Sequence, residues 1–134
     1  MNTARFLAGE RLILTLWVGG LWAIGFMVAP ALFAQLDDRA LAGTLAGVMF
    51  ELMAWVGLAC GSLLLLFNQL RSSRRRLNWR ALVLFLMLSI VVAGQFLLSP
   101  MIADLRSQGL TESAAFGRLH GIASALYLVN SLLG

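Results

Sequence analysis

Four polar side chains lie inside long apolar stretches of this sequence and are its best candidates for chemistry: Glu51, Gln95, His120 and Ser124. A carboxyl group and an imidazole can exchange protons, while an amide and a hydroxyl can hydrogen-bond a bound solute. In hydrocarbon, a charge such as that of Glu51 costs on the order of several kcal/mol unless it is neutralised, paired or hydrated. We therefore predict one shared polar site. The alternative is that each group has its own local partner, such as a backbone carbonyl.

Metal binding is a second possible chemistry, because several soft or borderline ligands lie in the apolar stretches. These are His120, Cys60, Met27, Met49, Met53 and Met101. Methionine is also a routine apolar filler, and no spacing here forms a ligand motif. His120, Met49 and Met101 stay open as weak candidates for a metal, and we expect no resident cofactor.

Catalysis is not indicated, because no intramembrane aspartate accompanies the one histidine, as a hydrolytic triad requires. We expect no enzyme and no catalytic residue. The favoured class is a non-enzymatic membrane or accessory component. The alternatives are handling of a soft metal or haem, and relay of protons or a small solute.

Four apolar runs must position these side chains. The first is uncharged from Leu12 to Ala34, and about 20 apolar residues are enough to cross a bilayer. The pattern predicts an all-α integral membrane protein, a four-transmembrane-helix bundle in a single domain over residues 1–134. The expected spans are 12–36, 40–70, 79–102 and 114–133, and no sequence repeat or second domain is visible.

Composition and charge agree with a membrane protein. Of the 134 residues, 60% are hydrophobic and 12% charged, whereas soluble domains carry about 25% charged residues. All ten basic residues are arginines; seven lie before the first run or in the stretch 71–80, and three lie on the opposite side. The positive-inside rule then predicts a multi-pass protein of the bacterial inner membrane with both termini cytoplasmic. The basic charge is thus explained without nucleic acid.

Small residues predict where the helices pack. Glycines in the first two runs allow close approach of a neighbouring helix, and a proline bends the first run. The predicted packing residues are Trp17, Gly19, Gly20, Pro30, Gly43, Gly47, Gly57 and Gly61. The expected partners are the lipid bilayer and the other helices of the chain, with a homodimer or another membrane protein as alternatives.

Three segments carry a resemblance to a known family. They are W-V-G-G-L-W-A-I-G-F-M-V-A-P-A-L-F, A-G-T-L-A-G-V-M-F-E and F-G-R-L-H-G-I-A-S-A-L-Y-L-V-N. The chain resembles a bacterial membrane family of unknown function that is similar to the domain of eukaryotic transmembrane protein 205. The resemblance implies a four-helix membrane protein with no established activity, and its eukaryotic relatives are linked to resistance to platinum compounds. The positions that carry it are Trp17, Gly19, Gly20, Pro30, Phe33, Gly43, Gly47, Phe50, Pro100, Phe116, His120, Ser124 and Asn130.

A weaker likeness rests on the opening Trp17-x-Gly19-Gly20. It is similar to copper-resistance D and related haem-associated membrane proteins, in which histidine-rich sites are expected. This chain has a single histidine.

Overall fold

The computed structural model describes residues 3–71 and 78–134 and is helical almost throughout that range. Arg74, Arg75 and Arg76 of the predicted basic loop lie outside the described residues. The elements are α1 (Thr3–Ala23), η1 (Ile24–Val28), α2 (Ala29–Gln35), α3 (Arg39–Arg71), α4 (Trp79–Ala93), η2 (Gly94–Leu98), α5 (Ser99–Ser107) and α6 (Ala114–Leu133).

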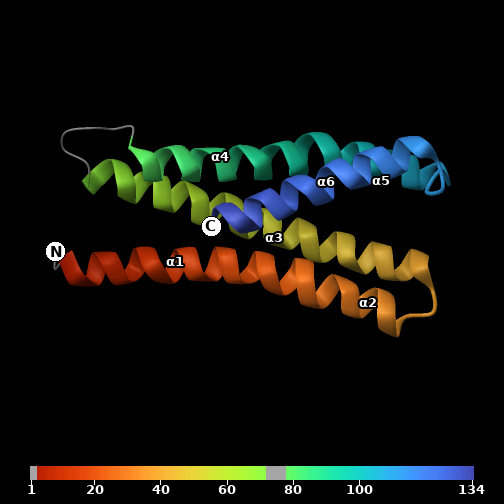
Figure 1. Ribbon diagram of the computed structural model, residues 1–134, viewed down its shortest axis with the longest axis horizontal. Coiled ribbons are helices and arrows are strands. Elements are labelled where there is room, and N and C mark those ends of the chain that lie inside the picture. Colours follow the sequence, from red (N-terminus) through yellow and green to blue (C-terminus); the bar gives the residue numbers. More distant parts are fainter. Residues whose placement is uncertain (1–2, 72–77) are drawn as a thin grey trace.

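The helices lie side by side along the long axis of the molecule (Figure 1). α3 packs against both α1 and α4, and α6 packs against α4, α5 and α1. The start of α1 and the end of α3 lie at one end of the bundle, which we call the N-terminal end. The connections from α2 to α3 and from α5 to α6 lie at the opposite end, which we call the turn end (Figure 1).

Three of the described helical segments are long and apolar enough to cross a membrane: Ala4–Gln35, Arg39–Arg71 and Trp79–Ser107. The first begins earlier than predicted, because the N-terminal residues continue α1. α6 does not reach this standard, so the predicted count of four transmembrane helices is not confirmed. Gly134, after α6, packs against Val18 and Met87, and α6 therefore ends part-way along the bundle (Figure 1).

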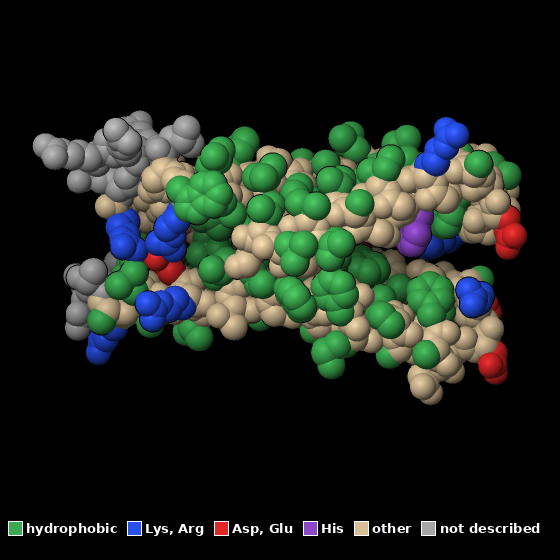
Figure 2. Space-filling model, viewed as in Figure 1, with side chains coloured by type: hydrophobic (Ala, Val, Ile, Leu, Met, Phe, Trp, Pro, Cys, Tyr) green, Lys and Arg blue, Asp and Glu red, His purple; other side chains and the backbone are tan. Residues whose placement is uncertain are grey.

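The surface fits a protein embedded in lipid. Large apolar side chains are exposed on all three long segments, among them Leu12, Leu52 and Phe85. An exposed apolar surface of this extent indicates a membrane or partner contact rather than water. Charged side chains gather at the two ends of the bundle: basic ones lie at both ends, and acidic ones lie at the turn end and among the basic ones at the N-terminal end (Figure 2).

Two segments of the chain share a structural repeat that the sequence pattern did not reveal. α1 and α4 each run into five residues of π-helix, η1 and η2, and each π-helix is followed by a short α-helix with proline in its first turn. Pro30 and Pro100 have no N–H to donate, so the helix must rearrange its hydrogen bonds next to them. Both segments run in the same direction, as parallel repeats do in membrane proteins.

The core forms where α1, α3 and α4 meet around Trp17, whose side chain is fully buried. A Cβ at Gly57 would stand 2.8 Å from the Trp17 Nε1, and one at Gly61 would stand 3.0 Å from the same ring. The indole therefore occupies the room that these two glycines leave. A Cβ at Gly20 would similarly stand 2.6 Å from the sulfur of Met53.

Gly19 corrects the predicted set of packing residues. It is exposed, and nothing lies within 4 Å of the place that a Cβ would take. Adjacent helical residues point about 100° apart at 3.6 residues per turn, so Gly20 faces α3 while Gly19 faces outward.

A buried carboxylate joins three helices at the N-terminal end. Glu10 on α1 is 3% exposed, and its Oε2 accepts from Arg71 Nη1 at 3.3 Å and from Arg80 Nη2 at 3.4 Å. Arg71 ends α3 and Arg80 lies in the first turn of α4, so one carboxylate links α1 to both α3 and α4. The arginine side chains are 48% and 51% exposed, which weakens each pair through solvent screening.

We expect Glu10→Gln to lower the free energy of unfolding by about 1–2 kcal/mol, because it removes the negative charge between two arginines. Thermal unfolding in detergent measures the effect. Glu112→Gln, at an exposed carboxylate, is the matched control and should leave the midpoint in place. Equal midpoints for the two variants would show that the Glu10 pairs contribute no stability.

Candidate functional site

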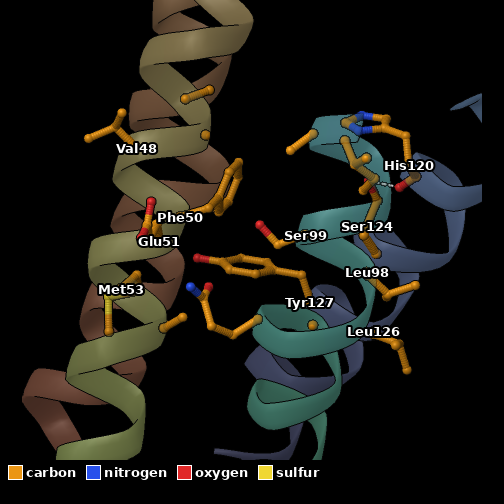
Figure 3. Close-up of a pocket in the computed structure, with 18 of the residues that line it drawn as sticks. Val48, Phe50, Glu51, Met53, Leu98, Ser99, His120, Ser124, Leu126 and Tyr127 are labelled. Carbon is orange, nitrogen blue, oxygen red and sulfur yellow. Dashed lines mark hydrogen bonds between the residues drawn. The ribbon is translucent and has the colours of Figure 1, made fainter. Parts of the chain in front are cut away.

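A cavity of about 420 Å³ lies between α3 on one side and the α4–α5 segment and α6 on the other. Ligand sites in proteins typically measure about 300–1,000 Å³. Figure 3 shows Phe50, Ser99 and Tyr127 pointing into this space from three different helices. Its lining is mainly apolar, with a few polar groups distributed along its length.

All four residues of the predicted polar site line this cavity: Glu51, Gln95, His120 and Ser124. Gln95 lies within η2 and is partly buried, while the other three are exposed. The Ser124 hydroxyl donates to the His120 backbone carbonyl at 2.8 Å (Figure 3). Within residues 3–71 and 78–134, no hydrogen bond joins the four side chains, so the cavity brings them together without pairing them.

The part of the cavity nearest the turn end holds a guanidinium that the sequence analysis did not single out. Arg106, at the end of α5, lines the cavity and is partly buried. Its Nη2 and Nη1 lie 3.7 Å from the Cβ positions of Gly43 and Gly47. These two glycines, predicted to pack a helix, instead leave room for an arginine side chain.

Two aromatic rings extend this arrangement on α6. The Arg106 guanidinium carbon lies 6.0 Å from the centroid of the Phe116 ring, within the range of a cation–π contact. The His120 imidazole stacks on the same ring, with centroids 6.0 Å apart and planes 5° from parallel. Arg106 and His120 therefore place two nitrogen-rich groups at this end of the cavity.

The middle of the cavity is built around Tyr127 on α6. Its hydroxyl donates to the Leu21 carbonyl at 2.6 Å. In a regular α-helix this carbonyl accepts from the Gly25 N–H. The tyrosine hydroxyl is inserted at this carbonyl, three residues before the π-helix η1 begins.

Gly25 is the residue that allows this insertion, because a Cβ at that position would collide with the Tyr127 ring. Phe50 packs edge-on against the same ring with centroids 5.0 Å apart. A second hydrogen bond, from Trp22 Nε1 to the Ser131 carbonyl at 3.0 Å, joins α1 to α6 nearby. Two hydrogen bonds thus join α6, which forms one wall of the cavity, to α1.

The far end of the cavity holds a buried amide. Asn130 on α6 is 2% exposed and lines the cavity. Its Oδ1 has no hydrogen-bond partner among the described residues. An unpaired buried polar group costs about 1–3 kcal/mol, so a native structure normally supplies a partner, a water or a ligand.

The weak metal candidates are not assembled. Met49 and Met101 do not line the cavity with His120. Within residues 3–71 and 78–134, no three His, Cys, Asp or Glu side chains lie close enough to hold a metal ion. Cys60 is free and buried in the core with Trp17.

A comparison with known protein families identifies the family of this chain. Residues 12–111 match the family described as Domain of unknown function (DUF4149). The chain belongs to this family. The matched range includes Glu51, Gln95 and Arg106 and ends before His120, Ser124 and Asn130. No curated protein and no solved structure matches the chain.

Proposed function

We propose that this chain is a non-enzymatic protein of the bacterial inner membrane that binds a small, elongated and mainly apolar solute in the cavity beside α3. The observation that carries the proposal is a mainly apolar cavity of about 420 Å³ with a few polar groups in its lining, among them the buried Asn130, whose Oδ1 has no hydrogen-bond partner among the described residues. Sites for small molecules combine apolar walls with a few polar groups that fix orientation. Relay of a small solute, raised by the sequence, starts from the same binding step.

Binding of a neutral probe tests this proposal. The chain is placed in nanodiscs of zwitterionic lipid, and the affinity for radiolabelled α,ω-dodecanediol is measured. Ala123→Phe, inside the cavity, should weaken binding by about tenfold or more. Ala125→Phe is the control, because Ala125 is an exposed residue of α6 outside the cavity lining. Gly47→Leu, at an exposed lining position on α3, is a second blocking variant. Equal affinities for blocking and control variants would contradict the proposal.

The orientation we propose places the N-terminal end in the cytoplasm. Arg5, Arg11, Arg71 and Arg80 lie at that end, whereas Arg39, Arg106 and Arg118 lie near the turn end. Arginines near membrane spans are more frequent on the cytoplasmic side, which supports this orientation. The part of the cavity nearest the turn end, beside Arg106, then lies in the periplasmic half of the membrane. We also keep as a proposal the resemblance of this chain to the eukaryotic transmembrane protein 205 domain.

Labelling of single cysteines measures the orientation. In a Cys60→Ala background, Gln108→Cys should react with an impermeant maleimide in intact cells, because the turn end faces the periplasm. Arg5→Cys should react only after the inner membrane is permeabilised. The reverse pattern would invert the orientation, and labelling of both from outside would contradict a membrane crossing by Ala4–Gln35.

A further inference from the structure

Arg106 is a charged group without a charged partner. Within residues 3–71 and 78–134, the two ion pairs both involve Glu10, at the other end of the bundle. The Arg106 guanidinium lies beside the Phe116 ring and against Gly43 and Gly47, and the residue lines the cavity. A guanidinium pairs best with a carboxylate or a phosphate, which accepts two parallel hydrogen bonds.

We propose that the solute is a single-chain amphiphile with a carboxylate or phosphate monoester at one end and a hydrogen-bonding group at the other. The inference rests on the proposed function and adds the charge and polarity of the ligand. Arg106 binds the anionic end, the apolar walls surround the chain, and Asn130 binds the polar end.

The spacing of the two anchors sets the length of the chain. His120, beside Arg106 on the Phe116 ring, and Asn130 are ten positions apart on α6, or about 15 Å at 1.5 Å per residue. Between them the walls include Phe50, Leu98 and Leu126. An extended chain of about a dozen carbons fits this separation, whereas a small inorganic anion would leave the apolar walls and Asn130 without contacts.

Glu51 fixes the direction in which the ligand enters. It lines the cavity on α3 one helical turn beyond Gly47, which is about 6 Å deeper as measured from the turn end. A carboxylate here repels an anionic group that moves past Arg106. The anionic end of the ligand therefore stays beside Arg106, near the turn end, and the neutral end enters the cavity first.

Three radiolabelled probes in zwitterionic nanodiscs test the charge: ω-hydroxydodecanoate, ω-hydroxydodecyl phosphate and α,ω-dodecanediol. At least one anionic probe should bind about tenfold more tightly than the diol, because a hydrogen bond to a charged group is stronger than one to a neutral group. The better anion identifies the natural headgroup as carboxylate or phosphate. Arg106→Gln should remove most of this preference, because the affinity for the anions should fall more than the affinity for the diol. Glu51→Gln should increase the affinity for the anions relative to the diol.

Failure of the anionic-ligand proposal can be told apart from failure of the proposed function. If all three probes bind equally to the unmodified chain, or if Arg106→Gln preserves the preference, the anionic ligand is wrong and the proposed function stands. If no probe responds to Ala123→Phe, the proposed function itself fails. Thermal unfolding of each variant shows whether it is folded. Arg106→Lys keeps the charge but not the bidentate geometry, and it should retain only part of the preference.

Discussion

Replacing Gly57 with leucine should lower the free energy of unfolding by about 3 kcal/mol, the upper part of the range for overpacking a core. Trp17 is fully buried, and its Nε1 already lies 2.8 Å from the Cβ position at Gly57. Val91 on α4 lies 3.4 Å from the same position, so the indole cannot move aside without displacing a second helix. The leucine side chain has no space to enter.

Gly19→Leu is the matched control, because Gly19 is a helical glycine that faces outward with open space around it. Thermal unfolding in detergent and in bilayers should show a large loss for Gly57→Leu and little change for Gly19→Leu. Similar midpoints for the two variants would show that the contact between α1 and α3 is wrongly placed.

Replacing Asn130 with leucine should separate binding from stability. The variant removes a buried oxygen without a partner, so the ligand-free protein should gain about 1 kcal/mol or stay unchanged. The affinity for α,ω-dodecanediol should fall about tenfold, because the polar end of the probe loses its hydrogen bond. A gain in stability together with a loss of binding is characteristic of a functional site.

Asn68→Leu provides the comparison at a buried asparagine in the core of the N-terminal half of the bundle. Asn68 is 6% exposed, and its Oδ1 accepts from Asn78 Nδ2 at 3.3 Å. The Asn78 side chain in turn accepts from the Ala81 N–H at the start of α4. Asn68 Nδ2, like Asn130 Oδ1, has no hydrogen-bond partner among the described residues, but Asn68→Leu also breaks the hydrogen bond from Asn78. It should therefore destabilise the protein and leave diol binding intact. If Asn130→Leu behaves in the same way, Asn130 has a structural role.

The apolar runs predicted the three long apolar helical segments. Glu51, Gln95, His120 and Ser124 were selected because each is costly in hydrocarbon, and all four line one cavity. Whether they act as one functional site is a separate prediction that the binding experiments address. The family likewise agrees with the expected membrane protein of unknown function.

Helix rotation could not be predicted from spacing alone. Gly19 and Gly20 are both small, and only the position of α3 decides which of them is in contact. Arg106 follows the third apolar run and resembles an ordinary surface charge in the sequence. Its position depends on α5 packing beside α6 and across from Gly43 and Gly47.

The π-helices show a similar limit. Pro30 predicted a bend, but the hydrogen bond from the Tyr127 hydroxyl to the Leu21 carbonyl is a contact across more than a hundred residues. The fourth predicted span is not confirmed, because Arg118, His120 and Asn130 lower the hydropathy of α6. Two of these three residues line the cavity.

Native mass spectrometry of the protein, released from its own membranes in nanodiscs, tests the central claim most directly. The unmodified chain and Ala125→Phe should each carry a bound molecule of defined mass that is absent from Ala123→Phe. Collisional release and fragmentation should then identify a single-chain amphiphile. A spectrum in which Ala123→Phe retains the same bound mass as Ala125→Phe, or in which no variant carries one and none binds the added diol, would contradict a ligand site in this cavity.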